Sequence, residues 1–327
     1  MSELGIVAAV AAVAGAVAAV LLERLIRSER VVLQLPPTPP WVSWCRPAVV
    51  TVVLTALVTA LVACELHHAC LDTPEVQPSE WGFYSRVVYH AVLVSLLVLA
   101  TTIDFDCYLI PDIITLPGMA LGLVAAVVVQ ELQIAHLWVD WAYAIPDLRG
   151  PYIPDWYDRV RWAHALAWSG TGLVAGMLVT QGVRLIASRL LQVEAMGFGD
   201  VTLMGMIGSF LGWQAVLLTF LIAPLVGLIA VAVGRLIANR RILPYGPFLS
   251  AAAVVVLFGW SRMWSATRMI FSDLVGLGLL LGAALVLLVA LLGLIRLYRA
   301  IPTGRDVSVQ HSDDSNAETV ESPQSPS

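Results

Sequence analysis

The chain has 327 residues, of which 59% are hydrophobic and 13% charged, and its formal net charge is −5. Soluble domains carry about 25% charged residues, so the composition excludes an ordinary soluble protein and indicates a polytopic membrane protein. All 18 basic residues are Arg, which excludes any catalytic scheme that depends on Lys.

Long apolar runs predict an all-α, polytopic membrane helix bundle with about eight or nine transmembrane helices. The candidate spans cover roughly residues 5–22, 47–63, 86–103, 113–130, 164–186, 201–213, 214–234, 246–260 and 274–295. The boundary between the sixth and seventh spans, at Gly212 and Trp213, predicts a tight turn or a re-entrant bend. The loop at 132–161 is rich in Trp, Tyr and Pro, and we expect it to lie along the outer interface.

The distribution of Arg predicts the orientation in the membrane. No basic residue precedes the first span, whereas Arg24, Arg27 and Arg30 follow it, which is typical of a retained span with its N-terminus outside. Arg residues also follow the fifth, seventh and ninth spans, so these loops are expected to face the cytoplasm from the plasma membrane. In this topology Asp104 ends one span and Asp200 begins another, both at the cytoplasmic edge.

The tetrapeptide at 197–200 reads Gly-Phe-Gly-Asp and opens an apolar run. Its two glycines allow a sharp turn and a close approach by another strand. Because a carboxylate at the edge of a bilayer is costly, Asp200 is a candidate functional residue. On spacing alone, an ordinary helix N-cap explains Gly-Asp at least as well.

A second acidic stretch lies upstream, where residues 103–112 read Ile-Asp-Phe-Asp-Cys-Tyr-Leu-Ile-Pro-Asp. Asp104 still lies on the apolar run, so a solvated loop role suits it poorly. Asp112 follows Pro111 and is expected to cap the next helix. For Asp106, a solvated position between two spans remains an alternative.

Together with Pro-Tyr-Gly-Pro-Phe at 244–248, these stretches resemble the type IV prepilin peptidases, which are membrane aspartic proteases of the Gly-x-Gly-Asp type. The resemblance covers roughly residues 86–260 and is most specific from Gly197 to Trp213. It implies that Asp104 and Asp200 are the catalytic pair, which would share one proton and activate water without a metal or another cofactor.

The substrate implied by the resemblance is a prepilin or pseudopilin, with a short basic leader, a Gly at the cut and then a hydrophobic helix. We expect Asp106 and Asp112 to attract the leader, although solvated loop charges are an equal alternative. Gly197 and Gly199 are expected to let the substrate strand approach. No nucleic-acid partner is expected, and the oligomeric state is left open.

The chain departs from the family pattern in two places. Thr202 stands where the family has Lys, which we expect to tune activity rather than abolish it. The loop after the first span holds Cys45 alone instead of two C-x-x-C pairs, so N-methyltransferase activity is predicted to be absent. The predicted organisation is N-terminal spans with a Pro-rich loop (1–85), a catalytic membrane domain (86–260), an extra span (261–302) and a disordered tail (303–327).

Two other interpretations compete with these. Cys64, His67, His68 and Cys70 resemble a metal cluster, but a Cys64–Cys70 disulfide, or no bond at all, is the favoured interpretation. For the whole chain, the rivals are a protease of the presenilin type, disfavoured because Ile103 replaces its Tyr, a non-catalytic pilin-binding homologue, and a proton-coupled transport or assembly protein.

Overall fold

The computed structural model describes residues 3–36, 38–139, 153, 156–193, 196–238 and 244–299. The helices in this part of the chain are α1 (Glu3–Val32), α2 (Pro40–His68), α3 (Glu80–Cys107), α4 (Asp112–Val129), α5 (Trp156–Arg159), α6 (Arg161–Leu191), α7 (Phe198–Ala238), α8 (Gly246–Ser272) and α9 (Leu274–Arg299). Apart from one isolated bridge between Thr73 and Val76, the described residues form no β-structure. The predicted all-α class is confirmed.

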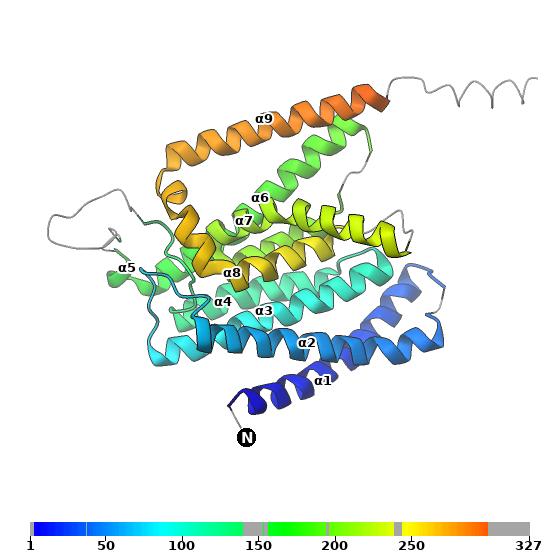
Figure 1. Ribbon diagram of the computed structural model, residues 1–327, viewed down its shortest axis with the longest axis horizontal. Coiled ribbons are helices and arrows are strands. Elements are labelled where there is room, and N and C mark those ends of the chain that lie inside the picture. The colour runs from blue at the N-terminus through cyan, green and yellow to red at the C-terminus, as the bar shows by residue number, and fades with distance from the viewer. Residues whose placement is uncertain are drawn as a thin grey trace, which may run out of the picture.

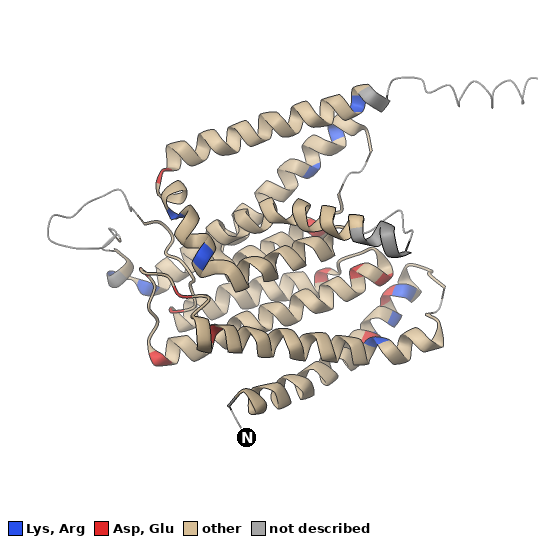
Figure 2. Cartoon of the chain, in the orientation of Figure 1, with Lys and Arg blue, Asp and Glu red and all other residues tan. Residues whose placement is uncertain are grey.

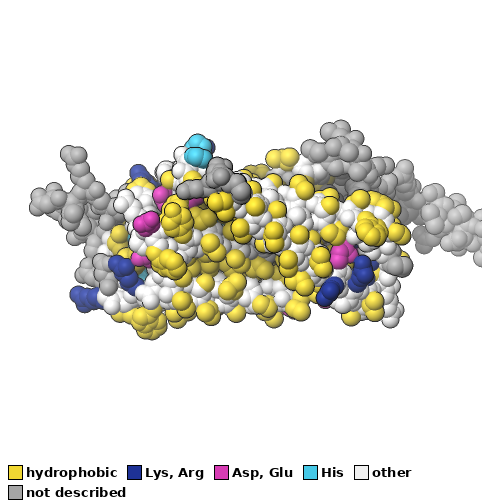
Figure 3. Space-filling model, turned by 90° about the horizontal axis from the view of Figure 1, so that it is seen from below, with side chains coloured by type: hydrophobic (Ala, Val, Ile, Leu, Met, Phe, Trp, Pro, Cys, Tyr) yellow, Lys and Arg dark blue, Asp and Glu magenta, His cyan; other side chains and the backbone are white. Residues whose placement is uncertain are grey.

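Eight of these helices are long and apolar enough to cross a membrane, and only the four-residue α5 is not. Most of them run side by side, with α1 and α9 at opposite edges of the bundle (Figure 1). Charged residues lie toward the ends of the helices (Figure 2), and hydrophobic side chains cover the length between them on the face seen from below (Figure 3). A hydrophobic surface of this kind can face lipid, and the helices satisfy their own backbone hydrogen bonds without water.

The helices extend beyond the predicted apolar runs. Helix α1 continues about ten residues past its run to Val32, and α8 continues from 260 to Ser272. Charged residues end a hydropathy run, but Arg and Glu are good helix formers and leave the backbone hydrogen bonds intact. The expected domain boundaries at 85/86 and 260/261 therefore fall inside α3 and α8, and the division into domains stays a prediction. The expected disordered tail lies outside the described residues.

The expected sixth and seventh spans are the two halves of α7, so the described part of the chain has eight helices long enough to cross a membrane, one of which contains both of these spans. Gly212 interrupts α7 with φ 79° and ψ 171°, a backbone conformation that is essentially restricted to glycine. Gly176 of α6 lies against both Met204 and Val216, which would be about 18 Å apart along a straight helix. The chain therefore reverses at Gly212, and the predicted turn there is confirmed.

Residues 131–139 differ from the expectation of a loop along the outer interface. Leu132 and Ile134 are buried, and the Ile134 carbonyl accepts a hydrogen bond from the Trp260 indole at 2.7 Å. The Gln214 amide donates to the His136 carbonyl at 2.8 Å. The segment is pulled into the bundle because Gln214 and Trp260 need partners where lipid supplies none. The rest of the expected loop lies largely outside the described residues.

The bundle core lies between α3, α4, α6, α7 and α8. Its largest buried side chains include Trp168 and Phe210, and the Phe210 ring stacks on Tyr89 with 4.5 Å between centroids. Gly172 of α6 meets Gly208 of α7 backbone to backbone, the small-residue contact that lets helices approach closely in lipid. These contacts fix where α7 begins, which sets the position of Asp200.

Candidate active site

Asp104 lies in the last turn of α3, and its side chain is buried. The helix ends at Tyr108, which has left-handed backbone angles and donates its N–H to the Asp104 carbonyl at 2.9 Å. The Asp104 carboxylate accepts a hydrogen bond from the backbone N–H of Gly246, the first residue of α8. A Cβ at Gly246 would lie 2.5 Å from Asp104 Oδ2. Only glycine lets α8 begin directly against this carboxylate.

Asp200 is the third residue of α7 and is also buried. The expected alternative, an ordinary N-cap, does not describe it, because the helix already begins at Phe198. Its carboxylate instead accepts a hydrogen bond from the backbone N–H of Gly197, just before the helix. This bond resembles the return half of a capping box and satisfies one N–H that the helix start leaves unpaired.

The two carboxyl groups come from different helices and interact electrostatically. The phenol of Tyr245, just before α8, also interacts electrostatically with Asp200. Burial, and then the charge of Asp200, raise the pKa of the Tyr245 phenol to about 12, so this hydroxyl keeps its proton at neutral pH. The structure thus brings together Asp104, Asp200 and the start of α8. Two buried carboxyl groups that interact electrostatically do not both ionise readily.

Thr202, two residues after Asp200, forms a pair with Thr115 of α4. Thr202 is almost fully buried, and its hydroxyl donates to the Gly199 carbonyl at 3.0 Å. The Thr115 hydroxyl of α4 donates to Thr202 Oγ1 at 3.2 Å. These bonds tie the start of α7 to α4, so the residue that departs from the family pattern braces the helix that carries Asp200.

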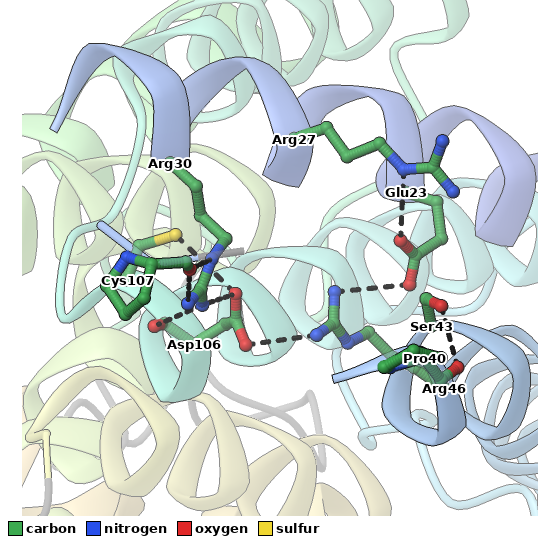
Figure 4. Close-up of polar contacts among 9 residues, drawn as sticks. Glu23, Arg27, Arg30, Pro40, Ser43, Arg46, Asp106 and Cys107 are labelled. Atoms are coloured by element: carbon green, nitrogen blue, oxygen red, sulfur yellow. Dashed lines mark hydrogen bonds and ion pairs between the residues drawn. The ribbon is translucent and has the colours of Figure 1, made fainter. Parts of the chain in front are cut away.

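Asp106 is directed toward α1 and α2 (Figure 4). Its Oδ2 atom lies 2.7 Å from Arg30 Nη1, and its Oδ1 atom lies 3.0 Å from Arg46 Nη2. Arg46 Nη1 in turn lies 3.1 Å from Glu23 Oε1. We call Glu23, Arg30, Arg46 and Asp106 the charge network. Both oxygens of the Asp106 carboxylate are therefore engaged by arginines.

The other expected substrate-binding residues lie nearer the surface. Asp112 is the first residue of α4 and is exposed. The N-cap position, which we expected Asp112 to occupy, is held by Pro111. Gly197 is exposed, whereas Gly199 is half-buried. A Cβ at Gly199 would lie 2.9 Å from the Cβ of Ile110, so the connection between α3 and α4 passes directly over the start of α7.

The Cys64–Cys70 stretch lies at the other end of α3, beside buried Arg86, which pairs with Glu65. All four cysteines are free thiols, and burial raises the pKa of Cys70. Among the residues that the structure describes, no group of three or more His, Cys, Asp or Glu side chains could hold a metal ion. The absence of a metal or cofactor requirement stays a prediction.

Four residues around the two aspartates are given no role of their own by the sequence patterns. Tyr245 and Gly246 belong to the Pro-Tyr-Gly-Pro-Phe stretch, which contributes to the family resemblance but by itself predicts only a turn before an apolar run. Arg30 and Arg46 count in the sequence only toward topology. They meet Asp106 across 76 and 60 residues of chain, a pairing that no local pattern reveals.

Comparison with known proteins gives a match over the region that carries both aspartates. The sequence model of the type IV leader peptidase family matches residues 91–232. The prepilin leader peptidase/N-methyltransferase of Aeromonas salmonicida is 29% identical over 208 residues, which cover 62% of this chain and 55% of that protein. The prepilin leader peptidase/N-methyltransferase of Klebsiella pneumoniae is 31% identical over 132 residues, or 40% and 44% of the two chains.

A relative with a different name matches the same region. The type 4 prepilin-like proteins leader peptide-processing enzyme of Escherichia coli O78:H11 is 28% identical over 167 residues, or 51% of this chain and 50% of that protein. The chain thus spans about half the length of the curated relatives that it matches, and no solved structure matches it significantly. Eight helices among the described residues are long and apolar enough to cross a membrane, which makes the chain a multi-pass membrane protein, and its residues 91–232 are similar to the type IV leader peptidase family.

Proposed function

We propose that the protein is a membrane aspartic endopeptidase that removes the short basic leader from type IV prepilins or pseudopilins. The observation that carries this proposal is the buried pair of Asp104 and Asp200, contributed by α3 and α7 and within electrostatic reach of each other. The names of the relatives, which denote prepilin leader peptidases, agree with it. The cut would fall after a Gly at the cytoplasmic edge of the plasma membrane.

In the proposed mechanism the two carboxyl groups hold one proton between them. The ionised carboxylate takes a proton from a water molecule, and the oxygen of this water attacks the scissile carbonyl carbon. The protonated carboxyl group hydrogen-bonds to the carbonyl oxygen. When the C–N bond breaks, a proton passes to the leaving amine. The N–H groups of Gly197 and Gly246 hold the two carboxylates during these steps.

The proposed orientation places the N-terminus outside and the aspartates on the cytoplasmic side. A leader would then stay in the cytoplasm while the hydrophobic helix of the substrate lies in the bilayer. Exposed Asp112 is better placed to meet a basic leader than Asp106, whose carboxylate is already paired with arginines. Exposed Gly197 and half-buried Gly199 would line the approach of the substrate strand. The absence of N-methyltransferase activity stays a prediction based on the missing C-x-x-C pairs.

Cleavage of a prepilin in membranes tests the proposal. Wild type is compared with Asp104→Asn and Asp200→Asn, which keep the shape of each side chain but remove its ability to ionise. We expect each variant to lose cleavage by at least about a hundredfold, because neither remaining group alone can both accept and donate the proton. Glu80→Gln, at the exposed opposite end of α3, is the matched control and should cleave like wild type.

The outcomes separate the rival functions. Normal cleavage by either Asn variant would exclude catalysis by this pair. A wild-type protein that binds prepilin but does not cut it would favour the non-catalytic homologue. A wild-type protein that neither binds nor cuts would favour the proton-coupled transport or assembly protein, and proton uptake assays on the same Asn variants would then decide.

A further inference from the structure

We propose that Arg30 and Arg46 are positioning residues that hold the last turn of α3, and with it Asp104, in the arrangement needed for cleavage. This inference rests on the proposed function. It assigns a role in the active site to α1 and α2, which lie outside the residues that match the family.

The contacts of Arg30 link three parts of the chain. From α1 it reaches the Asp106 carboxylate in α3, and its Nη1 lies 3.5 Å from the Asp106 carbonyl. Its Nε donates to the Pro36 carbonyl at 3.0 Å, in the linker between α1 and α2. Arg46, near the start of α2, bridges Asp106 and Glu23. The charge network thus clamps the end of α3 to both N-terminal helices.

The side chains of the charge network are more buried than those of a surface ion pair. The side chains of Arg46 and Glu23 are each 9% exposed, that of Arg30 is 14% exposed and that of Asp106 is 17% exposed. Exposed ion pairs contribute little because water screens them. Removing one partner from a buried pair instead leaves the other charge without compensation. Without its arginines, the Asp106 carboxylate would have to turn toward water.

The end of α3 particularly needs this positive charge. The C-terminal end of a helix carries a partial negative charge, which disfavours carboxylates in its last turn. Asp104 and Asp106 both lie in that turn, and α3 has no basic residue there. Arg30 and Arg46 supply the missing charge from neighbouring helices. Asp104 and Asp106 are two residues apart in one helical turn, and each residue between them can rotate only about φ and ψ. A movement of Asp106 therefore also displaces Asp104 from the Gly246 N–H.

A direct role of Asp106 in binding the basic leader makes the opposite kinetic prediction. In that case, removal of an arginine would free the carboxylate and lower KM. If the arginines position Asp104, their removal lowers kcat, since misplacing a catalytic group by about 1 Å can cost about a hundredfold. The two roles of Asp106 can therefore be separated by measuring both parameters.

The first experiment measures prepilin cleavage by Arg30→Gln and Arg46→Gln, with Arg27→Gln as the matched control. Arg27 lies one turn before Arg30 on α1, its side chain is 70% exposed, and it forms a long ion pair of 3.9 Å with Glu23 rather than with Asp106. We expect kcat to fall about tenfold or more in the first two variants, with KM within about twofold of wild type. Arg46→Lys, which keeps the charge, should recover part of kcat.

The second experiment does not depend on cleavage. Cys107 lies in the last turn of α3, is 7% exposed, and its Sγ lies 3.9 Å from Asp106 Oδ2. In a background where the other three cysteines are replaced by Ser, the rate at which N-ethylmaleimide labels Cys107 in folded protein reports how ordered this turn is. Arg30→Gln and Arg46→Gln should raise the rate about tenfold or more, whereas Arg27→Gln should not.

Unchanged labelling and unchanged kcat in Arg30→Gln and Arg46→Gln would overturn the inference, as would a lower KM without a loss of kcat. Failure of the wild type to cut any prepilin would instead sink the proposed function. The labelling rates would then still show whether the arginines hold the turn that carries Asp104, so the two failures can be told apart.

Discussion

At the scale of single residues, the contact between Gly246 and Asp104 leaves no room for a side chain at position 246. The Gly246 N–H hydrogen-bonds to the Asp104 carboxylate, and the missing side chain provides the space that this bond requires. Asp104 lies on α3 and Gly246 on α8, so the bond also fixes these helix ends relative to each other. A methyl group at this position must displace either the carboxylate or the helix.

Gly246→Ala should therefore reduce cleavage by about a hundredfold, because a displaced Asp104 loses its alignment with Asp200. Gly282→Ala is the matched control, since no atom lies within 4 Å of the added methyl group on α9. Prepilin cleavage by both variants, at equal amounts of inserted protein, checks this. Wild-type cleavage by Gly246→Ala would mean that the Asp104 position seen here is not the one used in catalysis.

The same residues show how far the sequence could predict the site. Asp104 and Asp200 are ionisable residues at the edges of apolar runs. The cost of placing a carboxylate there and the motifs around them both identify them as candidate functional residues. Gly246 lies in a stretch that contributes to the family resemblance, but the sequence gives neither Gly246 nor Arg46 a role of its own. Their importance comes from contacts made across more than fifty residues of chain, and these depend on how the helices pack. A prediction that Asp106 meets the substrate could not foresee that two arginines already occupy its carboxylate.

At the scale of helices, the reversal at Gly212 is the least usual feature. The backbone there has a positive φ, and a Cβ would lie 2.7 Å from Trp168 Cε2 of α6. The Trp213 indole donates to the Leu137 carbonyl at 2.7 Å immediately after the turn. The turn is thus defined by backbone conformation, by packing on α6 and by a hydrogen bond to the connection after α4.

Gly212→Ala should destabilise the protein, because a non-glycine residue in this conformation costs about 1–3 kcal/mol before the clash with Trp168 is counted. We expect a lower midpoint of thermal unfolding in detergent. Gly182→Ala on α6, where the added methyl group has no neighbour within 4 Å, serves as the control. Equal midpoints for Gly212→Ala and wild type would show that α7 does not reverse here.

The helices themselves were the most predictable part of the fold. Eight of the nine described helices coincide with apolar runs, because each needs a long hydrophobic stretch to cross a bilayer. Their ends were predicted less well. Helix α8 continues past Arg262 and Arg268 to Ser272, and nothing in hydropathy distinguishes a helix that continues beyond the membrane from one that stops there.

At the scale of the whole molecule, the orientation in the membrane decides which compartment the aspartates face. Cys45 lies near the start of α2, on the predicted cytoplasmic side, and is exposed. His67 lies at the other end of the same helix and is also exposed. A membrane-impermeant maleimide applied to intact cells should label a single-cysteine His67→Cys variant but not a variant that retains Cys45 alone. The reverse pattern would place the aspartates outside.

The reversal at Gly212 also determines how thick the membrane can be around this protein. The first half of α7 runs from Phe198 to Leu211, so its 14 residues extend about 21 Å. The hydrocarbon core of a bilayer is about 30 Å thick. Since Trp213 is fixed at the far end by Leu137, the lipid around α7 must thin, or headgroups must dip toward Asp200, at a small cost per ångström of mismatch. Asp200 would thus meet water below the plane of the surrounding headgroups.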